Sequence, residues 1–120
     1  MDRPSPKILL LINVDPTKSH RAVEALRIAL GLGSHNEGRD IRIILSGRAP
    51  YLLAEDTSAV IDAEILEKHL PVFLEWGTPF AISTDAEIPP QYVSGVVSTP
   101  ITQTALAAAL GSADRVLIFS

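Results

Sequence analysis

Cysteine and histidine, the side chains most often used for covalent catalysis and metal binding, are absent or scarce in this sequence. None of the 120 residues is cysteine, which excludes disulfides, thiolate metal sites and any persulfide carried by the chain itself. His20, His35 and His69 are far apart and lack the H-x-x-x-H spacing that pairs two imidazoles on a helix face, so we expect no metal and no cofactor. No Gly-x-Ser-x-Gly turn positions a serine. We assign no catalytic residue, and an enzyme is the less favoured interpretation.

One glycine-containing segment resembles a phosphate-binding loop. Residues 33–40 read Gly-x-x-x-x-Gly followed by Arg39 and Asp40, where a phosphate loop has lysine and a hydroxyl residue. That loop must also lie between a strand and the helix after it, whereas this segment follows a predicted helix and precedes a strand. The segment therefore predicts a helix end and a turn.

Polar side chains follow three predicted strands at their carboxyl ends. Ligands of open parallel sheets bind beyond these ends, and nearby helix N-termini favour anions. Arg48 supplies the fixed positive charge of this predicted rim, and Asp15 or Asp85 would be the base if a reaction took place there. The candidate ligand-binding residues are Asn13, Asp15, Ser46, Gly47, Arg48, Tyr51, Ser83, Thr84 and Asp85.

The elements that would position this rim alternate between strands and helices. Residues 7–14 and 41–46 are continuous apolar runs, typical of strands buried on both faces of a parallel sheet. Further strands are expected at residues 78–83, 92–97 and 116–119. Helices are expected from about residue 19, at 62–76 with a kink or split at Pro71, and between a cap at Thr99 and a stop at Gly111, just past the helix end. This order predicts one α/β domain over residues 1–120. The expected fold is a three-layer sandwich with a mostly parallel sheet of four to five strands, the first strand central and helices on both faces.

Composition restricts the partners. The net charge is −4 and the ten basic residues are scattered, which argues against nucleic acid. The apolar run after residues 1–7 is too short for a signal peptide, and no segment approaches the length of a membrane span. We therefore expect a cytoplasmic protein.

Several segments resemble the DsrE/DsrF-like family, to which the sulfur-relay TusBCD proteins belong. They are the strand end Asn13-Val14-Asp15, the helix segment 25–30, the stretches 38–45 and 47–53, and the closing strand at 113–119. The resemblance implies a small α/β domain that assembles into oligomers. The family's relay members carry a cysteine just after the third strand, where this chain has Ser83-Thr84-Asp85, so the resemblance implies a cysteine-free member.

Two functions follow from this interpretation. The first is a non-catalytic DsrE-like binding or assembly domain, with a protein partner in a sulfur-relay or redox-linked complex. The alternative is a small enzyme or sensor that binds an anionic metabolite at the carboxyl ends of the strands.

The sequence also predicts a homo-oligomer. A charged fraction of 20% is low for so small a domain, which must expose much of its surface. Aromatic residues contribute most of the binding energy at interfaces, so the predicted contact residues come from the irregular middle of the chain. They are Tyr51, Leu52, Leu53, Phe73 and Trp76, and the alternative is that these side chains pack beneath residues 54–61 instead.

Overall fold

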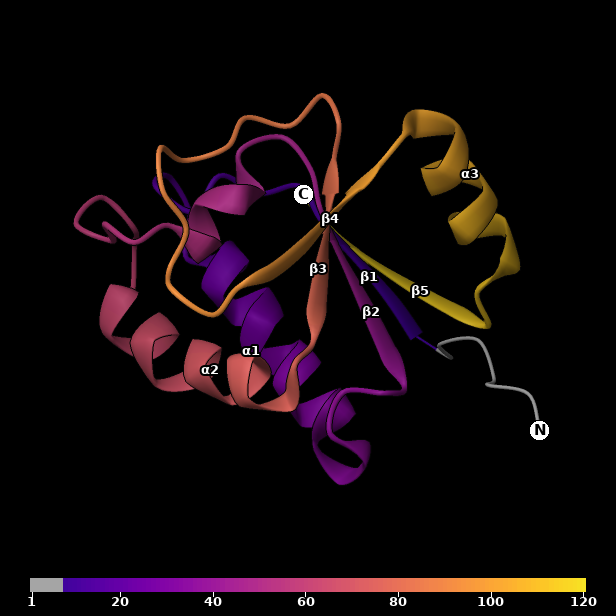
Figure 1. Ribbon diagram of the computed structural model, residues 1–120, viewed down its shortest axis with the longest axis horizontal. Coiled ribbons are helices and arrows are strands. Elements are labelled where there is room, and N and C mark those ends of the chain that lie inside the picture. The colour runs from indigo at the N-terminus through magenta and orange to yellow at the C-terminus, as the bar shows by residue number, and fades with distance from the viewer. Residues whose placement is uncertain (1–7) are drawn as a thin grey trace.

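Five parallel strands form one sheet in the order β4-β3-β2-β1-β5 (Figure 1). The computed structural model describes residues 8–120, so residue 7 of the predicted first strand and the interpretation of residues 1–7 lie outside it. The strands are β1 (Ile8–Ile12), β2 (Ile41–Leu45), β3 (Pro79–Ser83), β4 (Val97–Ile101) and β5 (Arg115–Phe119). β1 is an interior strand as predicted, but β2, not β1, is the middle one.

Helices cover both faces of the sheet, which confirms the predicted three-layer α/β fold. Figure 1 shows α1 (Arg21–Gly33) and α2 (Ala63–Trp76) on one face and α3 (Gln103–Ser112) alone on the other. Two short 3₁₀ helices, η1 (Ser34–Asn36) and η2 (Ala49–Leu53), lie in the connections. No helix in the described part of the chain is long and apolar enough to cross a membrane.

The apolar runs of β1 and β2 are continuous because each strand contributes to two cores. Leu10 and Ile43 point to the face of α1 and α2, where the main core also contains Leu26 and Phe73. Leu9 and Ile44 point to the opposite face and form a smaller core with Ile101 and the inner side of α3. Alternate side chains of a strand face opposite sides, so a strand buried on both faces loses the alternation of apolar and polar residues.

Of the kink or split expected at Pro71, the split does not occur. The helix is continuous from Ala63 to Trp76 with Pro71 inside it and exposed. Proline removes one backbone donor and crowds the preceding turn. Here Leu66, Leu70 and Phe73 are buried on the other side of the helix, and their packing holds the helix together across that position.

The predicted fourth strand and last helix begin too early in the sequence. Residues 92–96 form a loop, in which Tyr92 makes an isolated bridge to Ala54, and β4 begins at Val97. Pro100 belongs to this edge strand, where a missing N–H is tolerated, and does not start a helix. The residue that caps α3 is Thr102, whose hydroxyl accepts a hydrogen bond from the backbone N–H of Ala105, and Gly111 lies inside the helix.

Candidate functional site

The turn after β2 is closed by a glycine that packs against the end of β1. The Ser46 hydroxyl lies 3.1 Å from Asn13 Oδ1, and the Ser46 N–H donates to the carbonyl of Ile12. Gly47 has φ +60°, and a Cβ there would lie 2.4 Å from Asn13 Oδ1. Only glycine fits this turn, which brings the next residue, Arg48, over the end of β1.

Arg48 lies at the centre of the rim between two carboxylates and an aromatic ring. Its Nε lies 3.0 Å from Asp15 Oδ2, and its NH1 group pairs with the carboxylate of Glu87. The guanidinium also lies 4.4 Å from the centre of the Tyr51 ring, a cation–π distance. The positive charge is therefore already compensated inside the chain.

Asp15 is held in its ionised form. Partial desolvation raises the pKa of this carboxyl, but the side-chain and backbone hydrogen bonds from Thr17 and the charges of Arg48 and Lys18 outweigh it. The net result is a pKa below the ordinary value. A carboxylate whose proton affinity is lowered in this way is a poor general base, which argues against the catalytic role considered for Asp15.

The third part of the rim forms a separate network around Ser83. This serine is 2% exposed, and its hydroxyl donates to Asp85 Oδ1. Nε2 of Gln103, the first residue of α3, donates to Ser83 Oγ at 2.9 Å and to Asp85 Oδ1 at 3.1 Å. Thr84 is exposed, and its backbone N–H donates to the carbonyl of Ile101. The network has no histidine to take a proton from Ser83, so it orders the loop and does not activate the hydroxyl.

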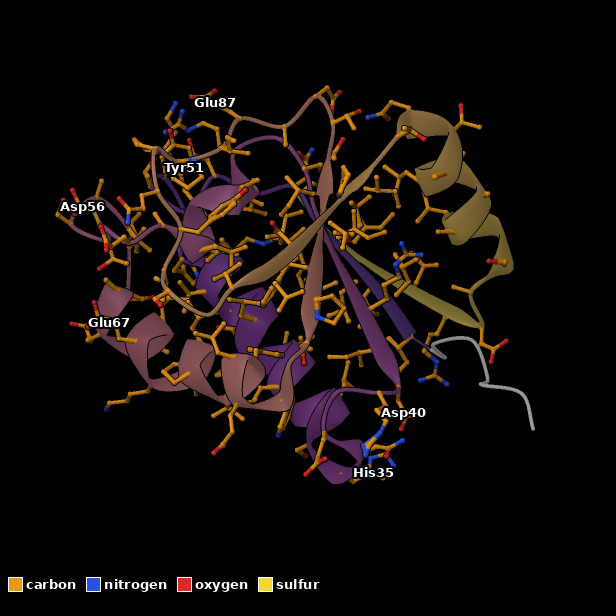
Figure 2. The ribbon with its side chains drawn as sticks, in the orientation of Figure 1. His35, Asp40, Tyr51, Asp56, Glu67 and Glu87 are labelled. Carbon is orange, nitrogen blue, oxygen red and sulfur yellow. The ribbon has the colours of Figure 1, made fainter. Side chains whose placement is uncertain are left out.

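The rim therefore consists of two clusters joined by a loop. Asn13, Asp15, Ser46, Arg48 and Tyr51 lie together, as do Ser83 and Asp85, and the N–H of Glu87 donates to the Gly47 carbonyl at 2.8 Å. Figure 2 shows Tyr51 and Glu87 at one end of the molecule, with His35 and Asp40 at the other.

Sequence reasoning missed two residues of these clusters. Glu87 pairs with Arg48 across 39 positions, and Gln103 reaches Ser83 across 20. Glu87 lies in the loop between β3 and β4, where the sequence has no helical or strand-like repeat from which its position could be predicted. Gln103 had a signal, because it directly follows the true cap of α3, but that cap was predicted three residues too early.

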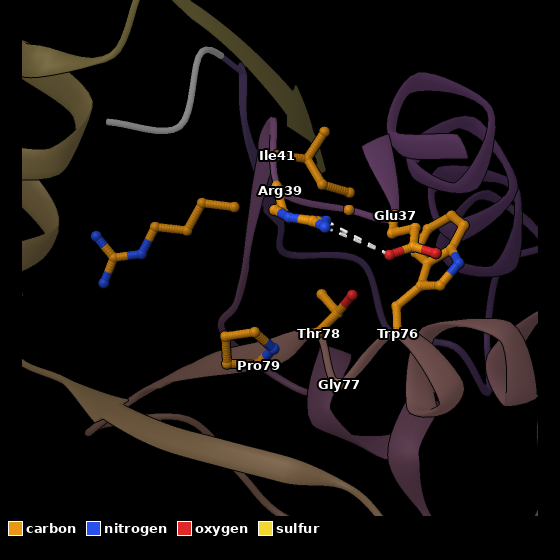
Figure 3. Close-up of a pocket in the computed structure, with 9 residues that line it drawn as sticks. Glu37, Arg39, Ile41, Trp76, Gly77, Thr78 and Pro79 are labelled. Carbon is orange, nitrogen blue, oxygen red and sulfur yellow. Dashed lines mark hydrogen bonds and ion pairs between the residues drawn. The ribbon is translucent and has the colours of Figure 1, made fainter. Parts of the chain in front are cut away.

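Two surface cavities of similar size lie at opposite ends of the strands. One, of about 410 Å³, lies beside Arg48 and Tyr51 and is lined mainly by residues 54–60 and 89–91. The other, of about 400 Å³, lies at the amino ends of β2 and β3 (Figure 3). Its lining residues are Glu37, Gly38, Arg39, Ile41, Arg42, Trp76, Gly77, Thr78 and Pro79.

Most of the predicted interface residues belong to the core of a single chain. Leu52, Leu53 and Phe73 are fully buried, so they cannot contact a second molecule. Tyr51 and Trp76 are half-buried and remain accessible. The buried leucines of η2 belong to the main core.

The strongest apolar surface lies instead around α3. None of its residues is buried, although its sequence, Gln-Thr-Ala-Leu-Ala-Ala-Ala-Leu-Gly-Ser, is mostly apolar and carries no charge. On the same face of the sheet, Ile118 of β5 is 58% exposed and Val97 of β4 is 46% exposed. Residues 88–113 contain none of the 24 charged side chains of the chain, 10 basic plus 14 acidic.

Comparison with known proteins supports the fold. The crystal structure of the YchN protein from E. coli matches with a TM-score of 0.70 and 22% sequence identity, covering 94% of this chain and 98% of that chain. YchN has a DsrE-like fold. No protein-family model matches the chain, and no curated protein matches it either. At this identity the likeness shows a shared fold.

Proposed function

We propose that this chain, with its YchN-like fold, is a non-catalytic DsrE-like assembly domain that associates with further copies of itself. In this proposal it serves as a structural or docking subunit in a sulfur-relay or redox-linked complex. The observation that carries the proposal is the uncharged surface formed by α3, β4 and Ile118, which we call the α3 surface.

The chemistry of the strand ends supports a non-catalytic role. The chain has no cysteine, and Ser83, the buried last residue of β3, donates a hydrogen bond to Asp85. A serine hydroxyl cannot carry persulfide sulfur, and a carboxylate alone is too weak a base to make it a strong nucleophile. Arg48 is occupied by Asp15 and Glu87.

The α3 surface has the properties expected of a contact surface. Monomeric proteins seldom leave a contiguous apolar patch uncovered, and a ten-residue helix in water depends on packing for its stability. Only the inner side of α3, through Leu106, Ala109 and Leu110, packs on the sheet. Ala105, Ala107 and Ala108 remain exposed on the helix. Small side chains such as these let another helix approach closely.

The absence of charge favours a second copy as the occupant. In a two-fold interface a residue close to the axis faces its own equivalent, so a charged side chain there would face a like charge. Each chain carries a net charge of −4, and neither α3 nor β4 contributes a charge to the resulting repulsion. The nearest charge on this face of the sheet is that of Arg42 on β2, whose partner in the sheet register is Leu9.

Introducing one charge on α3 tests the proposal. We expect the chain to sediment as a dimer or larger oligomer, and Ala108→Glu to shift it to a monomer, because an isologous contact would bury two like charges. Sedimentation equilibrium over a wide concentration range measures this. Glutamate is a good helix former, so circular dichroism should be unchanged.

The same substitution elsewhere is the control. Ala59 is exposed in the loop before α2, and Ala59→Glu should leave the oligomer intact. A wild-type chain that stays monomeric at every concentration, or two variants that dissociate equally, would contradict the proposal.

A second candidate, anion binding beside Arg48, has the 410 Å³ cavity in its favour. It requires Glu87 to release Arg48. Glu87→Gln removes the competing charge and should therefore strengthen phosphate binding about tenfold if this site is real. Isothermal titration calorimetry with inorganic phosphate compares the wild type with Glu87→Gln. Negligible binding by both proteins rules this candidate out.

A further inference from the structure

The cavity shown in Figure 3 exists because two neighbouring strands do not pair at their amino ends. The register of β2 and β3 begins at Ile43 and Phe80. One step earlier lie Arg42 and Pro79, and proline has no N–H to donate to the ladder. The gap is bounded on one side by the turn before β2 and on the other by the end of α2.

The glycines at this gap allow its two walls to meet. Gly77 ends α2 with φ +69°, and the N–H of Thr78 donates to the carbonyl of Phe73. Gly38 has φ +83°, and a Cβ there would lie 2.7 Å from Thr78 Oγ1 and 3.1 Å from the indole ring of Trp76. The indole ring therefore lies directly against the turn before β2.

The cavity has more positive than negative charge in a chain whose net charge is negative. Its charged lining residues are Arg39, Arg42 and Glu37. Arg39 pairs with Glu37 at 3.4 Å, but both side chains are about two-thirds exposed, so the pair is weak and can rearrange. Figure 3 shows this pair above Thr78, with Glu37 beside Trp76.

Two polar groups at the cavity have no partner within residues 8–120. Arg42 makes no ion pair or side-chain hydrogen bond in that range. Thr78 is 5% exposed, and its hydroxyl oxygen is enclosed without a hydrogen bond. Arg42 is exposed to solvent, whereas the enclosed Thr78 hydroxyl destabilises the fold unless a ligand or water satisfies it.

We propose that this cavity binds a small aromatic anion, a compound with a flat ring and a phosphate or carboxylate group. The ring would lie against Trp76, Ile41 and Pro79, which form the apolar part of the lining. The anionic group would lie at the edge of the sheet, where Arg42 would reach it from the α3 face and Arg39 would turn to it from Glu37. Arginine binds such planar anions through two parallel hydrogen bonds.

This site differs from the strand-end rim in place and in chemistry. It lies at the amino ends of the strands, whereas Arg48 lies at the carboxyl ends and is paired with two carboxylates. Arg42 lies on the same face of the sheet as α3, but the test below measures ligand binding and not self-association, so the two proposals can fail separately.

The chain supplies its own reporter, because Trp76 is its only tryptophan. Phenyl phosphate should change the Trp76 fluorescence in a saturable manner. It should bind at least about tenfold more tightly than phenol or inorganic phosphate alone, because each of these satisfies only half of the site. A change that does not saturate, or equal affinity for all three compounds, would overturn the proposal.

Substitutions of the charged lining residues test the role assigned to Arg42. Arg42→Gln should weaken phenyl phosphate binding about tenfold or more, and Glu37→Gln should strengthen it about threefold by freeing Arg39. Arg27→Gln, an exposed position on α1, is the control and should leave the affinity unchanged. If Arg42→Gln binds as tightly as the wild type while its fluorescence spectrum and melting temperature are unaltered, the site is not an anion site.

Discussion

At the scale of single residues, the clearest contribution of the rim is to stability. Asp15 accepts two hydrogen bonds from Thr17, at 2.9 Å from its N–H and 2.7 Å from its hydroxyl, and pairs with Arg48. These contacts fix the chain where β1 passes into the connection before α1. The same contacts lower the pKa of Asp15, so that its contribution to stability depends on pH.

Replacing this carboxylate should destabilise the fold near neutral pH only. A carboxyl whose pKa is lower in the folded chain stabilises it above the unfolded pKa of about 3.9, and this stabilisation is lost as the pH falls through the folded value. We expect Asp15→Asn to reduce the free energy of unfolding by about 1 kcal/mol at neutral pH and to match the wild type in acid. Urea unfolding at both pH values measures this, with Asp114→Asn as the control for losing one exposed charge.

The sequence was enough to predict that the residues of the first cluster lie together, because each follows a strand that could be recognised from neighbouring residues. Asn13, Asp15, Ser46 and Arg48 directly follow two buried strands, and neighbouring parallel strands end at the same edge of the sheet. The partner of Arg48 could not be predicted in this way. Glu87 reaches it from a loop whose position depends on tertiary contacts, including the hydrogen bond to Gly47.

At the scale of elements, the prediction was most accurate where a strand or helix buries a face. The bounds of β1, β2 and α2 lie within two residues of the predicted ones, because continuous apolar runs and helical spacing record that burial. The positions of β4 and α3 were predicted wrongly because their sequences carry no pattern of buried apolar residues. β4 is exposed at all positions but Ile101, and α3 has no buried residue. Thr99 followed by Pro100 resembles the start of a helix, and this local pattern led to a predicted cap three residues before the true one, Thr102.

The position of Gly111 inside α3 leads to a stability prediction. Glycine weakens a helix interior, and a Cβ at Gly111 would meet nothing within 4 Å. Gly111→Ala should therefore raise the free energy of unfolding by about 0.5 kcal/mol and the melting temperature by a few degrees. Gly38→Ala is the opposite control and should destabilise the fold, because φ is +83° there and a Cβ would lie 2.7 Å from Thr78 Oγ1. If Gly111→Ala lowered the melting temperature, the helix would end before that residue.

At the scale of the whole molecule, the distribution of charge is uneven. All charged residues lie outside residues 88–113, which contribute β4, α3 and the loop before them. The sheet therefore has one face covered by two charged helices and one covered by a single uncharged helix (Figure 1). The low charge that suggested an oligomer from composition alone is concentrated on one surface. The aromatic anchors expected from the sequence lie elsewhere, because Phe73 is needed in the core.

This distribution predicts how salt should affect self-association. An interface held by ion pairs weakens as salt screens them, whereas apolar contacts do not. Each copy carries a net charge of −4, so salt should also reduce the general repulsion between copies. We therefore expect the association constant to stay constant or to rise by up to about threefold when sodium chloride is raised from ~0.05 to ~0.5 M, a range over which the screening length falls severalfold. Sedimentation equilibrium at the two salt concentrations measures the change, with the monomeric Ala108→Glu variant as the reference. An oligomer that dissociates in high salt would show that charged residues outside the α3 surface hold the copies together.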